Sequence, residues 1–184
     1  MKGKSLLFIF VIVVIVIVAA LNVKTIGKHY YPMKYSKYIY EYSSKYNLSP
    51  YYVAAIAKTE SNFNPEAKSN KNAYGIMQIT EETGQWAAEK MGLKGFSADK
   101  LYDPEYSIRM GCWYLDNLRQ EFNNWDLVSA AYNGGRGNVR SWLNNKDHSK
   151  DGKNIHYIPF PETDKYVKKI RVNYNIYRWL YSNN

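Results

Sequence analysis

An unbroken apolar run from Leu6 to Leu21, LLFIFVIVVIVIVAAL, divides the chain into two unlike parts. Its 16 residues fall slightly short of the ~20 that a membrane-spanning helix needs and slightly exceed the ~7–15 of a signal-peptide core. Lys2 and Lys4 precede the run and are expected to stay on the cytoplasmic side of a membrane. The run therefore predicts that residues 1–24 are an uncleaved N-terminal membrane anchor, with a signal cleaved near Val18-Ala19-Ala20 as the alternative.

Both alternatives export everything that follows the run. In the first, the protein crosses the cell membrane once and its domain faces outward, whereas in the second it is secreted after signal cleavage. Residues 25–33 contain Gly27 and Pro32 and are expected to be a linker. Residues 34–184 have the length of one domain of ordinary size.

The composition allows a packed core and narrows the classes of partner. Apolar residues make up 46% of the chain and aromatic residues 16%, which is enough apolar surface for one core. The net charge of +9 indicates either simple solubility or attraction to a polyanion, but no arginine-rich run supports a nucleic acid partner. Cys112 is the single cysteine and the three histidines lack ligand spacing, so that we expect no metal and no cofactor.

Helical periodicity and capping signals, without a clear strand pattern, predict a mostly α-helical domain. Ser49-Pro50 and Asp103-Pro104 each combine an N-cap residue with a proline suited to the first helical turn. Thr80 is expected to cap a further helix, and residues 144–160 to form a loop. We expect helices over about residues 35–46, 50–61, 80–91, 104–122, 126–133, 139–143 and 162–180.

Glu60 lies at the C-terminal end of the helix expected over residues 50–61, whose buried face would be Val53, Ile56 and Ala57. The partial negative charge of a helix C-terminus disfavours an ionised carboxylate, and partial burial acts in the same direction. Both effects raise the pKa of a carboxyl group, and they favour a proton donor near neutral pH. By position alone, a solvated surface charge is the alternative, so the choice depends on the residues around Glu60.

Four short motifs follow one another along the chain. The first is Glu60–Ser69, ESNFNPEAKS, and the second is Gly75–Ile79, GIMQI. The third is Ala131–Gly135, AYNGG, and the fourth is Ile158–Thr163, IPFPET, followed by Tyr166-Val167. Each motif alone could be an ordinary turn or helix cap. Together, and in this order, they closely resemble the signature of the SLT-domain lytic transglycosylase family.

The resemblance implies a mostly α-helical, lysozyme-like domain over residues 34–184 that cleaves peptidoglycan between N-acetylmuramic acid and N-acetylglucosamine. Within it, Glu60 matches the catalytic acid of the family. Departures from the family pattern are mild: Ile76 replaces the usual Leu, Gly134 the commoner Ala, and Thr80 puts one subsite contact in doubt. The resemblance further implies substrate-binding roles for Ser69, Gln78, Tyr114, Tyr132, Asn133, Glu162 and Tyr166.

The single candidate acid predicts a mechanism that needs only one carboxyl group. Ordinary glycosidases use a pair of carboxylates, ~5–5.5 Å apart when retaining and ~6.5–9.5 Å apart when inverting, and Glu60 has no motif-matched partner. We therefore expect protonated Glu60 to donate to the glycosidic oxygen. As a carboxylate, it would then accept the proton of the C6 hydroxyl of N-acetylmuramic acid, which closes to a 1,6-anhydro end. A tethered hydroxyl has a high effective concentration, so it needs no second carboxylate to activate water.

Two other functions could use the same groove. A goose-type-like lysozyme would add water to the cleaved bond, and a non-catalytic peptidoglycan-binding module would leave the bond intact, although the presence of Glu60 favours an enzyme. The expected partners are peptidoglycan glycan strands and, through the N-terminal helix, the cell membrane, with the catalytic domain facing the cell wall. Wall remodelling for growth or sporulation, or for a secretion or conjugation machine, fits this location equally well.

Overall fold

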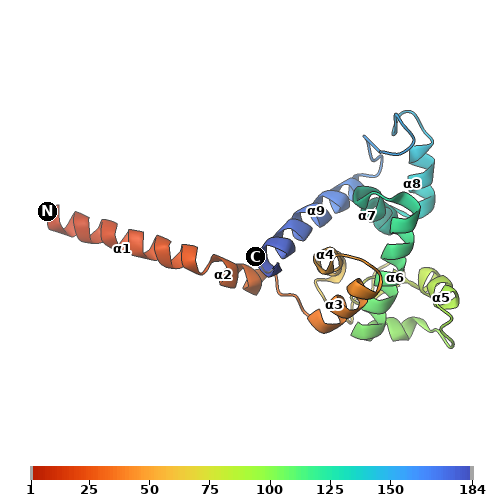
Figure 1. Cartoon of the computed structure of the whole chain (residues 1–184), viewed down its shortest axis with the longest axis horizontal. Helices are drawn as coiled ribbons and strands as arrows, with labels where there is room; N and C mark the ends of the chain where they lie inside the picture. The colour runs from red at the N-terminus through yellow and green to blue at the C-terminus, as the bar shows by residue number, and fades with distance from the viewer. Residues whose placement is uncertain (1, 183–184) are drawn as a thin grey trace.

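The computed structural model describes residues 2–182, with side chains from Leu7 onward, and its described part is mostly α-helical (Figure 1). This confirms the predicted fold class, and most helix ends lie within one residue of the prediction. The helix expected over 139–143 begins earlier, at Arg136. In chain order the elements are α1 (Lys2–Leu21), α2 (Val23–Tyr30), α3 (Ser36–Lys45), α4 (Pro50–Ser61), β1 (Ala73–Tyr74), β2 (Ile79–Thr80), α5 (Glu81–Lys90), the 3-10 helix η1 (Ala98–Tyr102), α6 (Pro104–Phe122), α7 (Trp125–Gly134), α8 (Arg136–Leu143) and α9 (Pro161–Tyr181).

Helix α4 lies at the centre of the compact part, between α3 and α9 (Figure 1). Every residue from Tyr52 to Ala57 is buried, so burial extends around the helix beyond the predicted apolar face. A helix that is apolar on all sides is one that a core surrounds. Its most extensive packing is against α9, whose Ile170 and Tyr177 are also buried.

Side-chain caps fix the start of α5 and α6, as Asn124 does for α7. Thr80 caps α5 and Asp103 caps α6, each by accepting a hydrogen bond from the backbone amide three residues later, at 3.2 and 2.7 Å respectively. Both caps confirm the prediction. Ser49 occupies the predicted N-cap position of α4, although its hydroxyl makes no capping hydrogen bond. Helix α4 begins instead through Pro50, whose fixed φ suits a first turn.

A short antiparallel hairpin follows α4, although no strand was expected. Strands β1 and β2 have only two residues each, with Tyr74 opposite Ile79. Two residues are too few to show the alternation by which a strand is recognised in a sequence. The turn requires Gly75, because its φ is +70° and a Cβ atom there would lie 1.9 Å from the Leu101 carbonyl oxygen.

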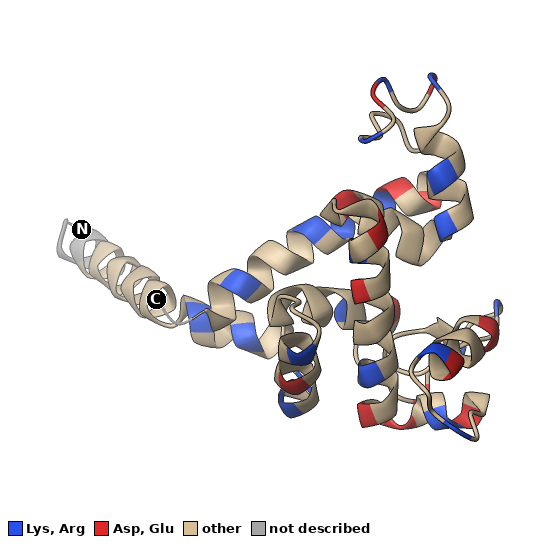
Figure 2. Cartoon of the chain, turned by 45° about the vertical axis from the view of Figure 1, so that its right-hand side comes forward, with Lys and Arg blue, Asp and Glu red and all other residues tan. Residues whose placement is uncertain are grey.

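Helix α1 extends away from the compact part, and its residues from Leu7 to Leu21 carry no charged side chain (Figures 1 and 2). The large apolar side chains from Leu7 to Val18 are between 40% and 67% exposed. Within the described residues, no single helix is long and apolar enough to span a membrane. Leu7–Leu21 and Val23–Tyr30 together have the length and composition of a span bent by 60°. The predicted anchor stays a prediction.

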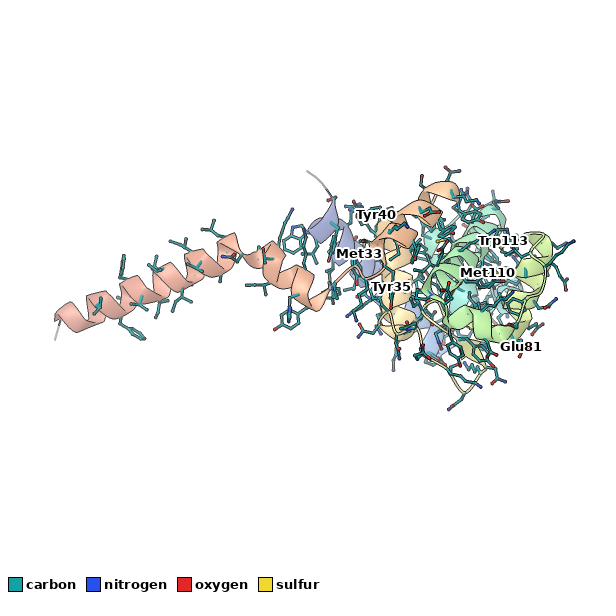
Figure 3. All side chains as sticks on the ribbon, turned by 90° about the horizontal axis from the view of Figure 1, so that it is seen from below. Met33, Tyr35, Tyr40, Glu81, Met110 and Trp113 are labelled. Atoms are coloured by element: carbon teal, nitrogen blue, oxygen red, sulfur yellow. The ribbon has the colours of Figure 1, made fainter. Side chains whose placement is uncertain are left out.

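The segment expected to be a linker is largely helical. Helix α2 packs against the C-terminal end of α9, where a Cβ atom at Gly27 would come within 2.6 Å of Leu180 Cδ2. Gly27 therefore permits close helix contact here and does not end a helix. After α2 the chain passes through the buried Met33, which lies at the junction with the compact part (Figure 3). The division into anchor, linker and domain stays a prediction.

Candidate active site

Glu60 lies in the last turn of α4, just before the chain turns toward the β1–β2 hairpin. Asn62 ends the helix in the left-handed conformation, with a φ of +54°. The Ser61 hydroxyl donates to the Ile76 carbonyl oxygen at 2.9 Å, although the two residues lie 15 positions apart. This hydrogen bond holds the hairpin against the end of α4, and so the first two motifs lie side by side.

A hydrogen bond from α9 fixes the Glu60 carboxyl group. The Tyr166 hydroxyl donates to Glu60 Oε1 at 2.6 Å, across 106 positions of sequence. The Tyr166 side chain is itself buried, because it lies on the face of α9 that packs against α4. The packing of two helices therefore sets the orientation of the carboxyl group.

The surroundings of Glu60 favour its protonated form. Burial raises the pKa of Glu60 from 4.5 to about 7, the Tyr166 hydrogen bond and the charge of Lys169 oppose this rise, and the charge of Glu162 adds to it. The side chain is only partly exposed to solvent. A carboxyl group with a pKa near 7 can both donate and accept a proton at neutral pH. The expected rise in pKa is confirmed, with burial as its main cause.

Tyr132, near the end of α7, bonds to the hairpin and not to Glu60. Its hydroxyl donates to the Met77 carbonyl oxygen at 2.7 Å, and its ring packs on Tyr114 with centroids 5.4 Å apart. Burial, together with the charge of Glu60, raises the pKa of both Tyr132 and Tyr166, so both hydroxyls stay protonated. Tyr166 is thus the tyrosine that orients Glu60, and sugar contact by Tyr132 stays a prediction.

Ser69 and Gln78 shape the loop and hairpin that follow Glu60. The Ser69 hydroxyl oxygen accepts hydrogen bonds from two backbone amides of its own turn, both at 3.2 Å. The Gln78 side-chain nitrogen donates to the carbonyl oxygens of Ala67 at 3.1 Å and Gly75 at 3.0 Å. Both side chains are partly exposed. These bonds explain why the motif needs polar residues here, while their contact with substrate stays a prediction.

A hollow of about 400 Å³ opens between the end of α7 and the start of α9. Asn133 and Glu162 both line it. The Asn133 side-chain oxygen accepts a hydrogen bond from the Thr163 hydroxyl at 2.8 Å, which joins the third motif to the fourth. Thr163 was not among the predicted site residues, although it belongs to the fourth motif.

Glu162 lies at the solvent-exposed edge of this hollow. Its carboxylate is 3.8 Å from Lys71 Nζ, and the two side chains are 75% and 79% exposed. At this exposure an ion pair contributes only ~0–1 kcal/mol. Because Lys71 also lines the hollow, the pair joins the loop after α4 to the start of α9 across it.

A second hollow, of about 430 Å³, lies beside the turn between α7 and α8. Tyr114 and Trp86 line it with ring centroids 6.2 Å apart, and the Arg136 guanidinium lies 5.0 Å from the centroid of the Trp86 ring. The sequence did not indicate Trp86, Arg136 or Lys71 as site residues. An arginine within a Gly-Gly-Arg-Gly turn was the only local signal, and it matched no site motif.

The structure thus brings the motif residues into three neighbouring groups. Glu60 and Tyr166 form the inner group, with Tyr132 close enough for the charge of Glu60 to act on it. Asn133 and Glu162 lie in the first hollow, and Tyr114 lies in the second. Within residues 2–182, no group of three or more His, Cys, Asp or Glu side chains could hold a metal ion.

Two solved transglycosylases share this fold. The 70 kDa soluble lytic transglycosylase of Escherichia coli has a TM-score of 0.76 and 33% identity, over 85% of this chain and 26% of that one. An inactive mutant of the lytic transglycosylase Slt from Pseudomonas aeruginosa, with a glutamine in place of a glutamate, has a TM-score of 0.72 and 32% identity, over 81% and 24%. The fold and the site define a lysozyme-like helical domain with a partly buried glutamate.

Residues 37–155 match the transglycosylase SLT domain, and the chain belongs to this family. The soluble lytic murein transglycosylase of Escherichia coli K12 is 38% identical over 152 residues, which cover 81% of this chain and 24% of that one. Membrane-bound lytic murein transglycosylase C of Serratia proteamaculans is 35% identical over 116 residues, 58% of this chain and 32% of that one. This chain therefore spans about a quarter of the length of the soluble relative.

Proposed function

We propose that this protein is a peptidoglycan lytic transglycosylase that cleaves the bond between N-acetylmuramic acid and N-acetylglucosamine. The observation that carries the proposal is the Glu60 carboxyl group, whose pKa burial raises to about 7 and which Tyr166 orients at 2.6 Å. Membership of the SLT family, and likeness to relatives named as lytic transglycosylases, support this class of reaction.

In the first step, protonated Glu60 donates its proton to the glycosidic oxygen. The bond between this oxygen and C1 of N-acetylmuramic acid breaks, and the N-acetylglucosamine unit leaves with the proton. The N-acetyl oxygen of the muramic acid stabilises the positive charge at C1. Tyr166 assists because its hydroxyl donates to Glu60 Oε1, and such a bond is stronger to the carboxylate than to the acid.

In the second step, the Glu60 carboxylate acts as a base. The C6 hydroxyl of the same N-acetylmuramic acid attacks C1, and its proton passes to Glu60 as the 1,6-anhydro bond forms. The reaction neither consumes nor releases water, and Glu60 regains the proton that it gave in the first step. Because the nucleophile is part of the substrate, its effective concentration is high.

The surroundings of Glu60 favour this single-carboxylate route over hydrolysis. Glu162 is the carboxylate whose charge acts on Glu60, yet its side chain is 75% exposed and pairs with Lys71. In an inverting glycosidase, the carboxylate that activates water lies ~6.5–9.5 Å from the acid, on the opposite face of the sugar ring. Glu162 is better suited to contact the sugar or peptide at the edge of the groove.

The other motif residues are proposed to bind the glycan. Tyr114, with Trp86, offers aromatic surface on which a sugar ring can stack. Asn133 and Glu162 offer polar groups in the neighbouring hollow. Ser69, Gln78, Tyr132 and Tyr166 shape the groove around Glu60 and are proposed to contact the substrate there.

The N-terminal segment is proposed to place this activity at the cell wall. Residues 1–24 would anchor the chain in the cell membrane, residues 25–33 would link the anchor to the domain, and residues 34–184 would act on the wall. Some relatives are named as membrane-bound and others as soluble, so secretion after signal cleavage is the alternative. Wall remodelling, alone or with a secretion machine, would use such an enzyme.

The variant Glu60→Gln tests the proposal directly, because glutamine has nearly the same shape but cannot donate the proton. We expect the release of soluble fragments from purified peptidoglycan to fall by ~10²–10⁴-fold, while circular dichroism shows a folded domain. Glu66→Gln, which changes an exposed carboxylate in the following loop, is the matched control and should keep the wild-type rate. Wild-type turnover by folded Glu60→Gln would contradict the assignment.

A further inference from the structure

Charge is unevenly distributed along this chain. All 16 acidic residues lie between Glu41 and Asp164, whereas residues 1–40 and 165–184 hold 11 of the 25 Lys and Arg residues and no acid. Residues 41–164 carry 14 basic and 16 acidic residues, so the net charge of +9 comes from the two ends. The fold brings part of these ends together, because α2 packs against the C-terminal end of α9 (Figure 2).

Helix α2 also presents apolar side chains that the domain leaves uncovered. Val23, Ile26 and Tyr30 follow the i, i+3, i+7 spacing and therefore share one side of the helix. Their side chains are 48%, 48% and 68% exposed. Trp179, from the adjoining end of α9, is 48% exposed.

Basic side chains lie beside these exposed apolar groups. Lys24 Nζ lies 6.0 Å from the centroid of the Trp179 ring, and Lys28 Nζ lies 5.1 Å from that of the Tyr181 ring. Arg178, next to Trp179, is also exposed. Exposed tryptophan and tyrosine next to lysine and arginine are typical of protein surfaces that lie at a membrane–water interface.

A single residue, Asn22, separates this surface from the end of α1. Helix α1 is apolar from Leu7 to Leu21, and after Asn22 the axis of α2 is turned by 60°. A bend of this kind allows a helix that leaves a bilayer to continue along its surface. The apolar side of α2 is therefore continuous in the chain with the segment proposed as the anchor.

We propose that α2 and the C-terminal end of α9 form a docking surface for the anionic lipid headgroups of the membrane that holds α1. Val23, Ile26 and Trp179 enter the interface, and Lys24 and Lys28 lie near lipid phosphates. A wall polyanion would be attracted by the cations but would gain nothing from the exposed apolar side chains, so lipid is favoured. The inference rests on the proposed anchor and is independent of the chemistry of Glu60.

Docking would fix the position of the active site relative to the membrane. Trp179 and Tyr166 lie on the same helix, α9, 13 residues apart, which corresponds to roughly 20 Å of helix length. Because Tyr166 holds Glu60, the α9 helix would act as a rigid spacer between the lipid surface and the carboxyl group. The site would then reach the wall strands nearest the membrane.

Quenching of tryptophan fluorescence by lipids with brominated acyl chains tests this proposal on the full chain. The protein is placed in nanodiscs of phosphatidylcholine alone or of phosphatidylcholine with phosphatidylglycerol. In the anionic discs we expect quenching of up to about a fifth of the emission, since Trp179 is one of five tryptophans, and less in the neutral discs. Trp179→Phe should remove this quenching, whereas Trp125→Phe, which changes a tryptophan that is 44% exposed on α7, should keep it.

A pair of charge variants tests the role of the lysines. Lys24→Gln with Lys28→Gln should lower the quenching to its level in neutral discs. Lys146→Gln with Lys150→Gln removes the same charge from the exposed α8–α9 loop and should change nothing. An unquenched Trp179, equal quenching in both lipids, or a chain that does not enter the discs would overturn the proposal. Binding of soluble polyphosphate with Trp179 unquenched would also overturn it and would assign the surface to a wall polyanion.

Discussion

Helices α1 and α4 are both rich in apolar residues, but they lie in opposite surroundings. Every α4 residue from Tyr52 to Ala57 is buried, whereas the large side chains of α1 from Leu7 to Val18 are at least 40% exposed. Helix α4 has α3 and α9 packed around it, and α1 projects from the compact part (Figure 1). The apolar sequence of a helix alone therefore does not determine whether protein packs around it. That depends on the neighbouring elements of the fold.

The two helices also differ in what their C-terminal ends hold. Helix α4 ends in a carboxyl group, Glu60, whose pKa burial raises to about 7. Helix α1 ends beside α2, where the exposed side chains include Lys24 and Lys28 and no acid. Burial thus raises the pKa of Glu60 into the range needed for proton transfer. Exposure leaves Lys24 and Lys28 accessible to negatively charged partners.

Matched truncations in α4 and α1 should give the largest difference in the free energy of unfolding. Ile56→Ala, at a fully buried position of α4, is expected to lower the free energy of unfolding by ~2–5 kcal/mol, because it leaves a cavity. Ile15→Ala, at a position of α1 that is 61% exposed, should leave the unfolding of the domain unchanged. Denaturant unfolding in detergent, followed by circular dichroism, measures both. Equal losses would show that α1 packs on the domain.

The pH dependence of stability tests whether burial raises the pKa of Glu60. Between pH 4.5 and about 7, the folded state keeps a proton on Glu60 that the unfolded state has lost, so the free energy of unfolding falls as pH rises. The full effect is about 3 kcal/mol. The stability of Glu60→Gln relative to the wild type should therefore increase by this amount across the window, while that of Glu66→Gln stays flat. A flat difference for Glu60→Gln would mean that burial does not shift this pKa.

Tyr166→Phe should have a smaller effect, confined to the carboxyl end of α4. In the wild type, the hydrogen bond from Tyr166 to Glu60 Oε1 lowers the pKa of Glu60. The variant loses this bond, so the pKa of Glu60 should rise and the alkaline limb of the pH–rate profile should move to higher pH. The loss of this bond should raise the activation free energy by about 1.5–3 kcal/mol, which lowers kcat/KM by roughly 10- to 150-fold. Tyr174→Phe, on a partly exposed part of α9, should leave the profile in place. An unmoved profile in Tyr166→Phe would rule out the positioning role.

The smallest effect is expected at the exposed edge of the groove. Lys71→Gln or Glu162→Gln breaks an ion pair whose side chains are 79% and 75% exposed, so the free energy of unfolding should change by only ~0–1 kcal/mol. Thermal unfolding at low and high salt measures it. A loss comparable to that of Ile56→Ala would mean that this pair, like α4, belongs to the packed structure.

Local signals in the sequence were sufficient to predict most helices and to identify Glu60 as the candidate acid. Pro50 sets the start of α4, and Asp103 with Pro104 sets the start of α6, because these residues act within one turn of the helix that they begin. Glu60 could be singled out because its helix is apolar and because its neighbours match a family motif. Its raised pKa followed from the same burial.

Long-range features could not be predicted in the same way. The Tyr166–Glu60 hydrogen bond spans 106 positions, and no local pattern indicates which tyrosine of α9 faces α4. Strands β1 and β2 are too short to show a period. Gly27 was interpreted as part of a linker, and only the contact with Leu180 shows why a helix has a glycine there.

The central claim is that Glu60 works alone and that the substrate supplies its own nucleophile. Digestion of purified peptidoglycan in water enriched in heavy oxygen, followed by mass spectrometry of the fragments, tests it most directly. We predict N-acetylmuramic acid ends in the 1,6-anhydro form, without solvent oxygen, from the wild type and none from Glu60→Gln. Reducing ends that carry heavy oxygen would contradict the claim and identify a hydrolase.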